Sequence, residues 1–196
     1  MTEQKRVTPD LKALESSVNS GPKGGLPPVH LWNPPFSGDM DMCIRRDGSW
    51  VHEGGVINRF ALVKLFSSIL KREEGKFYLV TPVEKVGITV EDAPFVAVDV
   101  EAEGEEAAQQ LTFITNIGDQ VVADAANPIR VEKDAKTGEP APYVHIRAGL
   151  EALIDRKTFY RLMDLCVVEG DWFGLWSGDR ANYYLFPLFG ILVPLC

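Results

Sequence analysis

The chain has 196 residues, of which 45% are hydrophobic and 24% are charged, which is ordinary for a soluble globular protein of one domain or two small ones. Its formal net charge of −8 argues against general nucleic-acid binding, because neutralising phosphates requires a basic face. The 3 cysteines are far apart and odd in number, and no apolar signal-peptide core follows Met1, so we expect a cytoplasmic protein without a disulfide framework.

The N-terminal residues 1–28 are predicted to be a short helix followed by a linker. Residues 8–16 begin with Thr8-Pro9, and proline is favoured in the first turn of a helix. Residues 20–28 are rich in glycine and proline, which favours an extended connection. We therefore treat residues 1–28 as a segment ahead of the first folded domain.

The first folded domain, predicted over residues 29–85, opens with a β-hairpin. Alternate positions from Met40 to Ile44 are apolar, which is the periodicity of a strand with one buried face. Asp47-Gly48 favours a tight turn, because such turns require positive φ at both central positions. Residues 50–52 then form the returning strand.

A helix is predicted next, with Asn58 as its N-cap, because a side-chain oxygen there accepts from an unpaired backbone N–H. Gly75 is expected to end this helix. Residues 77–80 are aromatic and branched, which favours a strand. The residues of the helix expected in one core are Leu62, Val63, Leu65, Phe66 and Ile69.

The second folded domain is predicted over residues 86–196. It should contain a hairpin over residues 129–147 and a helix with Asp155 as its N-cap, whose core residues are Phe159, Leu162 and Met163. The acidic run from Glu101 to Glu106 indicates a solvated loop. Ahead of the hairpin, short strands are expected at residues 85–91, 95–101, 111–115 and 120–123.

The two domains share a repeated sequence. Ile57-Asn58-Arg59 recurs as Ile154-Asp155-Arg156, and each copy leads into an apolar helix. Upstream, Trp50-Val51-His52 corresponds to Tyr143-Val144-His145. Two copies are too few for a solenoid. The sequence therefore predicts an α+β protein built from two strand–helix–strand units, with mostly antiparallel sheets.

The C-terminal residues 185–196 are apolar but contain prolines at 187 and 194. A membrane-spanning helix needs about 20 residues, so we expect no membrane span. A final strand or an apolar flap packed on the body is the expected role, while contact within an oligomer or adhesion to a membrane stays open.

Six stretches carry a resemblance to a known family: Arg46 to Trp50, Ile57 to Arg59, Leu62 to Phe66, Leu79 to Lys85, Val90 to Phe95 and Arg147 to Ala152. Taken in order, over roughly residues 32–177, they resemble the bacterial domain-of-unknown-function family twelve eighty-five. The resemblance implies a duplicated α+β core, with a second half loosely like a pleckstrin-homology barrel, and no established activity. It also suggests a ligand-binding groove between the halves and a role in signalling, although a fold does not fix a function.

His52 and His145 occupy matching positions in the repeat, each two residues after an aromatic residue on the same strand face. They either form a site, for a metal or for sensing pH, or reflect duplication of a strand histidine with its domain. A zinc site needs three or four ligands, and the sequence identifies no others. We therefore predict no metal and no cofactor.

Arg59 and Arg156 follow the predicted N-caps, where free backbone N–H groups and partial positive charge favour anions. Two interpretations stay open. The arginines form ion pairs with nearby carboxylates, or they clamp a carboxylate or phosphate with their guanidinium groups. The candidate carboxylates are Asp47, Glu84, Asp92 and Glu151.

No nucleotide-binding, metalloprotease or hydrolase motif occurs in the sequence. Glu84 could act as a general base, but a salt bridge explains it as well, because no acid or nucleophile is identified beside it. The predicted ligand-binding residues are Arg59, Arg156, His52, His145, Glu84 and Arg147, and no catalytic residue is predicted.

We therefore expect a non-enzymatic protein that binds a small anionic ligand between the two repeats in a regulatory or signalling role. The alternatives are an enzyme of an unrecognised, hydrolase-like class and a protein-binding scaffold. A small anion is the expected partner, nucleic acid is not expected, and a homo-oligomer stays open.

Overall fold

The structure of the protein is a computed structural model that describes residues 25–105, 108–133, 137–169, 172–177 and 182–187. The chain divides into two compact units, Met1–Pro94 and Phe95–Cys196. The predicted helix at residues 8–16 and the apolar residues 188–196 lie outside the described ranges.

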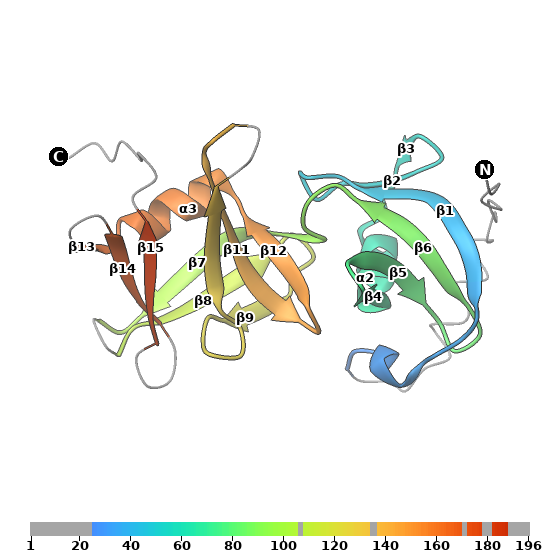
Figure 1. The fold of residues 1–196 in the computed structure, drawn as a ribbon, viewed down its shortest axis with the longest axis horizontal. Helices are drawn as coiled ribbons and strands as arrows, with labels where there is room; N and C mark the ends of the chain where they lie inside the picture. Colours follow the sequence, from blue (N-terminus) through green and yellow to red (C-terminus); the bar gives the residue numbers. More distant parts are fainter. Residues whose placement is uncertain (1–24, 106–107, 134–136, 170–171, 178–181, 188–196) are drawn as a thin grey trace. The chain divides into compact units, whose positions relative to one another are not determined.

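Over residues 25–94, the described part of the first unit, the chain forms one α-helix and six strands (Figure 1). They are η1 (Val29–Leu31), β1 (Phe36–Ile44), β2 (Trp50–His52), β3 (Gly55–Val56), α2 (Phe60–Ser68), β4 (Leu70–Glu73), β5 (Lys76–Val80) and β6 (Lys85–Val90). The strands form one sheet in the order β3-β2-β1-β6-β5-β4, in which β1 and β6 run parallel and the other neighbours antiparallel. Although the sequence assigned Lys85 to Val90 largely to the second domain, β6 is thus an inner strand of the first sheet.

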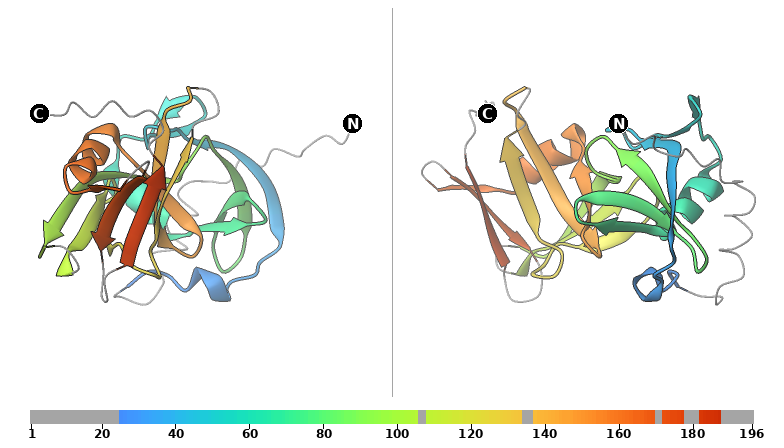
Figure 2. Two further views of the ribbon diagram at one scale, coloured as in Figure 1. Left: turned by 60° about the vertical axis from the view of Figure 1, so that its left-hand side comes forward. Right: turned by 45° about the vertical axis from the view of Figure 1, so that its right-hand side comes forward.

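The core of the first unit lies between this curved sheet and α2, which packs against the concave face (Figures 1 and 2). Phe66 of α2 and Ile69, the C-cap of this helix, are fully buried, as predicted, and the Trp50 ring stacks on Phe66 with 6.2 Å between ring centroids. Leu62, Val63 and Leu65 are only half-buried. The reason is that a helix of this length presents a single narrow face to the sheet.

The first helix ends earlier than the sequence predicted. It stops at Ser68, and Leu70 opens β4, which pairs with β5. Glu74 and Gly75 form the turn between these strands, with φ values of 49° and 78°. Tight hairpin turns require positive φ at both central positions, so Gly75 serves a hairpin instead of the helix end assigned to it.

The second unit contains one α-helix and nine strands within the described ranges. They are β7 (Phe95–Glu103), β8 (Gln110–Thr115), β9 (Gln120–Val122), β10 (Ile129–Lys133), β11 (Pro140–Arg147), β12 (Leu150–Ile154), α3 (Arg156–Met163), β13 (Val167–Glu169), β14 (Trp172–Ser177) and β15 (Asn182–Pro187). One sheet has the order β10-β11-β12-β7-β8-β9, with β12 and β7 parallel, and β13-β14-β15 form a second sheet.

Buried side-chain hydrogen bonds join the two sheets of the second unit. The Ser177 hydroxyl at the end of β14 donates to the Ala123 carbonyl at 2.7 Å and accepts from the Leu111 N–H at 3.0 Å. Gln109 Nε2 donates to the Trp176 carbonyl at 2.7 Å. On the six-stranded sheet, α3 packs against β7, and Phe159, Leu162 and Met163 are buried, as predicted (Figure 1).

Both units follow the chain order of three strands, a helix and three strands, with β7 to β9 preceding the second copy. Of the prediction of two repeated strand–helix–strand units, the coarser part is confirmed: the chain has two similar, strand-rich halves, whereas the few helices make each half mostly sheet. The sheets are mixed, and a pleckstrin-homology-like barrel is not clearly present, because the described strands of the second half divide between two sheets. None of the described helices is long and apolar enough to cross a membrane.

Candidate functional site

A hollow with a volume of about 420 Å³ lies on the sheet of the first unit. Three adjacent strands contribute its walls, with β6 in the middle and β1 and β5 on either side. We name it the Gly87 hollow, and its lining residues are Asp39, Met40, Asp41, Lys76, Gly87, Ile88 and Thr89.

Strand alternation places the acids of β1 away from the core. Met40, Met42 and Ile44 are buried, so the intervening Asp39 and Asp41 project from the other face of the strand. The register between β1 and β6 is irregular here, because β1 advances from residue 39 to 43 while β6 advances only from 87 to 89. Such bulges re-aim side chains, and this one lies beside the hollow.

Gly87 forms the floor of the hollow, directly under the Asp39 carboxylate. A β-carbon added at residue 87 would collide with Asp39 Oδ1 and stand 3.3 Å from Asp39 Cγ. Glycine within a strand often marks a close approach of another group to the backbone, and here that group is the Asp39 carboxylate. The absence of a side chain at residue 87 therefore lets Asp39 lie across β6.

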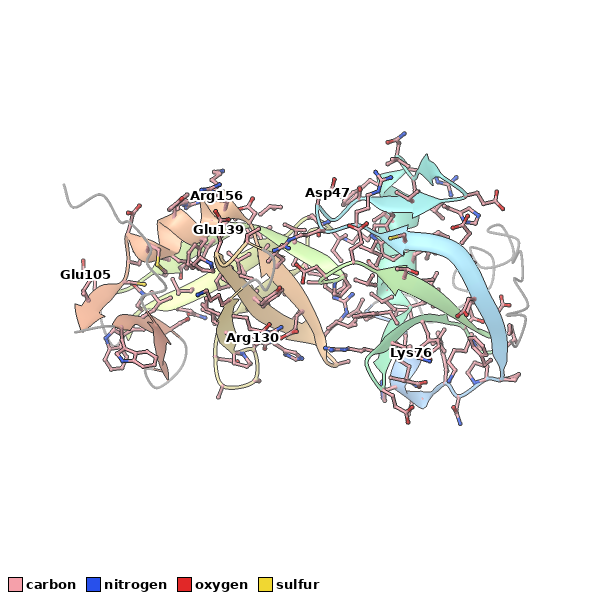
Figure 3. All side chains as sticks on the ribbon, turned by 45° about the horizontal axis from the view of Figure 1, so that its top comes forward. Asp47, Lys76, Glu105, Arg130, Glu139 and Arg156 are labelled. Carbon is pink, nitrogen blue, oxygen red and sulfur yellow. The ribbon has the colours of Figure 1, made fainter. Side chains whose placement is uncertain are left out.

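The polar side chains of the hollow have no protein partners among the described residues: no hydrogen bond or ion pair engages Asp39, Asp41, Lys76 or Thr89 through its side chain. Lys76, on β5, is labelled in Figure 3. Two carboxylates, one ammonium group and one hydroxyl are thus open to a bound molecule.

The neighbouring charges on the same sheet are paired. Glu73 on β4 forms ion pairs of 2.8 Å with both Lys71 and Lys85, and Lys85 Nζ lies 5.1 Å from the centroid of the Tyr78 ring. Hydrogen bonds from Lys71 and then Lys85 lower the pKa of the Glu73 carboxyl from its usual value. Glu73, Lys71 and Lys85 thus satisfy one another, whereas the polar side chains of the hollow form no such pairs within the described residues.

His52, a predicted site residue, supports the frame of the hollow. Its Nδ1 lies 3.0 Å from the Asp41 carbonyl oxygen, which also accepts from the Glu53 N–H at 3.1 Å. Because a carbonyl oxygen only accepts, Nδ1 is the donor. His52 therefore fixes the backbone of Asp41 and does not itself line the hollow.

Arg59 and Glu84, also predicted as site residues, do not line the hollow. Arg59 is the N-cap of α2, so the assignment of that position to Asn58 is wrong, and no side chain caps this helix. Glu84 lies in the turn between β5 and β6, where the Thr81 hydroxyl accepts from the Glu84 N–H at 3.2 Å. Anion binding by Arg59 stays a prediction.

In the second unit, His145 and Arg147 make contacts within their own domain. The Gly149 N–H donates to His145 Nε2 at 3.1 Å across the turn between β11 and β12. Arg147 forms an ion pair with Asp119 and lies 4.9 Å from the centroid of the Phe95 ring. Both contacts favour structural roles for these two predicted site residues.

Arg156 opens α3, and Asp155 caps this helix as predicted, accepting from the Thr158 N–H at 2.7 Å. The Arg156 guanidinium lies 5.8 Å from the centroid of the Tyr160 ring and donates to its hydroxyl at 3.3 Å. Tyr160, and to a smaller extent Glu139, raise the pKa of Arg156. Figure 3 labels Arg156 and Glu139 close together at this end of α3.

The second unit contains an ion pair that the sequence did not indicate. Arg130 Nε and Nη2 donate to the two Glu151 oxygens at 2.6 and 2.8 Å, and the guanidinium lies 4.2 Å from the centroid of the Tyr143 ring. Glu151 is one of the predicted candidate partners of Arg59 and Arg156, and its carboxylate is instead engaged by Arg130. Asp92, another such candidate, pairs with Arg46 at 3.3 Å.

Comparison with known proteins gives a family but no activity. The model of the DUF1285 N-terminal domain matches residues 27–93, and that of the C-terminal domain of the same family of unknown function matches residues 94–185. A crystal structure of a DUF1285 family protein from Silicibacter pomeroyi DSS-3 is 64% identical, with a TM-score of 0.80 over 89% of this chain and 93% of that one. Another, from Shewanella baltica OS155, is 27% identical, with a TM-score of 0.51 over 64% and 91%. No curated protein matches the chain.

Proposed function

Because the chain belongs to the DUF1285 family, whose domains are of unknown function, we propose a function from the geometry of the site: this is a binding protein that takes a small molecule in the Gly87 hollow. In this proposal the protein has a regulatory role, in which ligand binding changes its interaction with another molecule. No reaction is assigned to the protein.

The observation that carries this proposal is the set of unpartnered polar side chains around the hollow. Polar side chains that are open to solvent form hydrogen bonds with water. A ligand that replaces the water with charged hydrogen bonds gains about 1.5–3 kcal/mol for each. The volume of about 420 Å³ lies within the usual range of small-molecule sites.

The arrangement of these groups favours recognition over catalysis. Nucleophilic catalysis needs a hydroxyl, thiol or amine held by an adjacent base. The hollow contains one hydroxyl, on Thr89, and no hydrogen bond in the described structure joins it to Asp39 or Asp41. The negative charges of Asp39 and Asp41 are on β1 and the positive charge of Lys76 is on β5. Such an arrangement suits a site that binds the two ends of a ligand separately.

A thermal-shift screen tests the proposal, because a ligand of the native state must raise the melting temperature. The panel contains amines, carboxylates, zwitterions, sugars and nucleotides. It is applied to the wild type, to the double variant Asp39→Asn, Lys76→Met, and to the control Lys64→Met, Glu101→Gln, whose residues are exposed and lie outside the hollow. We expect a compound that stabilises the wild type and the control but not the hollow variant. If no compound stabilises the wild type more than the hollow variant, the proposal is wrong.

A further inference from the structure

We infer that the ligand of the Gly87 hollow is a small ω-amino acid, a molecule with an amine at one end and a carboxylate at the other. This inference rests on the proposed function and adds the chemical class of the ligand. It follows from the arrangement of opposite charges on the strands that line the hollow.

The negative and positive groups of the hollow belong to strands that are not adjacent. Asp39 and Asp41 are on β1, Lys76 is on β5, and β6 lies between them. Neighbouring strands are about 4.8 Å apart, so the backbones of β1 and β5 are separated by about 10 Å, and the Asp39 carboxylate reaches over β6 into part of this span. Lys76 forms no ion pair with either aspartate within the described residues, so the two poles do not neutralise each other.

The part of the hollow between the two poles is suited to a short aliphatic chain. Gly87 contributes no side chain, and Met40 and Ile88 line the hollow only from strand positions whose side chains alternate to the other face, so the backbone of β6 forms its floor. A ligand ammonium group beside the aspartates and a ligand carboxylate beside Lys76 would form charge-assisted hydrogen bonds at both ends. Methylene groups would then span the backbone of β6 between the two charged ends.

Like-charge repulsion argues against the other common classes of small ligand. A dicarboxylate or a nucleotide would place a negative group near Asp39 or Asp41, and a diamine would place an ammonium group near Lys76. Such a juxtaposition opposes binding, and repulsion of the wrong ligand contributes to specificity together with favourable contacts to the right one. The ω-amino acid avoids both repulsions in one orientation only.

The test uses wild-type protein and a homologous series: glycine, β-alanine, γ-aminobutyrate, δ-aminovalerate and ε-aminocaproate. The readout is protection of Cys43 from iodoacetamide, measured for its own peptide by mass spectrometry. Cys43 is half-buried and pairs in register with Thr89, so the two side chains share the face of the sheet that carries the hollow. Pentylamine and pentanoate, which each lack one charged end of δ-aminovalerate, are the matched controls.

We expect γ-aminobutyrate or δ-aminovalerate to protect Cys43 at concentrations at least tenfold lower than glycine, whose charges are too close together to reach both poles. Each control should need at least tenfold more than δ-aminovalerate. Asp39→Asn should reduce the advantage of δ-aminovalerate over pentanoate, and Lys76→Met should reduce its advantage over pentylamine.

The inference is overturned if pentylamine or pentanoate protects as well as δ-aminovalerate. Should another compound from the screen protect Cys43 while no ω-amino acid does, the hollow is a binding site for a different class. If nothing protects Cys43 and nothing raises the melting temperature, the proposed function fails too.

Discussion

The Asp39 carboxylate lies over the backbone of Gly87, in space that a side chain at residue 87 would occupy. The two residues are paired in register on the parallel strands β1 and β6. This contact places a negative charge above β6, and among the described residues no cation forms an ion pair with it.

The substitution Gly87→Ala should displace the Asp39 carboxylate while keeping the net charge. The backbone tolerates alanine, because the φ of Gly87 is outside the positive range, and the obstructing atoms belong to a short movable side chain. We expect Cys43 protection by δ-aminovalerate to weaken at least tenfold, about 1.4 kcal/mol, with a melting temperature near that of the wild type. Alkylation kinetics and thermal unfolding measure the two quantities.

Gly55→Ala is the matched control for this substitution. A β-carbon at residue 55 would have only the His52 carbonyl oxygen as a neighbour, at an ordinary contact distance of 3.5 Å. Ligand protection should be the same as in the wild type. Equal weakening by both alanines would show that the contact of Asp39 with Gly87 does not determine binding.

Three substitutions of His52 should distinguish the stabilisation that comes from its Nδ1 hydrogen bond from the stabilisation that comes from the rest of the ring. His52→Ala removes the hydrogen bond to the Asp41 carbonyl and should lower the free energy of unfolding by about 0.5–1.5 kcal/mol. The amide of His52→Asn carries a donor near the position of Nδ1 and should restore part of this loss, whereas His52→Gln places its donor farther along. Urea denaturation of the three variants gives the comparison. Identical losses in all three would mean that the hydrogen bond contributes nothing measurable.

The ion pair between Arg130 and Glu151 should stabilise the second unit modestly. Its geometry is bidentate, but the two side chains are 40% and 21% exposed, which reduces the interaction through solvent screening. A double-mutant cycle of Arg130→Met and Glu151→Gln should give a coupling energy of about 1 kcal/mol. The free energy of unfolding is the quantity measured, and a coupling near zero would contradict the prediction.

Glu73 should make stability depend on pH in the acid range. Its pKa is lowered in the folded state, so its contribution is fully present above the unfolded pKa and is lost as the pH falls through the folded pKa. The difference in unfolding free energy between wild type and Glu73→Gln should be at most about 1 kcal/mol at neutral pH and should decline below about pH 4.5. A difference that grows on acidification would have the wrong sign for this ion-pair arrangement.

Anion binding at the repeat arginines remains a prediction for each residue separately. If the start of α3 binds an anion, Arg156→Ala should weaken binding of inorganic phosphate by about 1.5–3 kcal/mol, and Arg59→Ala should do the same at α2. Isothermal titration calorimetry measures both affinities. Unchanged affinity in Arg156→Ala would leave the guanidinium with its contact to Tyr160 as a structural role.

The repeated motif made the two helices predictable, because capping and helical spacing are local properties of the chain. Asp155 caps α3 as the sequence indicated. β4 was missed since Ile69 and Leu70 continue the helical spacing of α2, and only the turn at Glu74 and Gly75 shows that the chain has already left the helix. Short elements of this kind are decided by the turn that follows them.

The hollow was not predictable from the sequence, although its acids were visible. Asp41 alternates with buried methionines, which indicates an outward-facing position. That Asp39 meets Gly87 depends on parallel pairing of β1 with β6, two strands far apart in the chain. Strand periodicity indicates which face of a sheet a side chain occupies, but not which strands pair with each other. The repeat therefore led to the prediction of His52 and Arg59 as site residues, whereas no sequence signal indicated Lys76 or Thr89.

The most direct test of the central claim is a nuclear magnetic resonance titration of the uniformly ¹⁵N-labelled protein with δ-aminovalerate. We predict saturable changes in the backbone amide shifts of Asp39, Asp41, Gly87 and Thr89, with no comparable change at Arg156 or Tyr160. Saturable changes confined to α3, or no saturable change at any of the four hollow residues, would contradict the assignment of the Gly87 hollow as the site of an ω-amino acid.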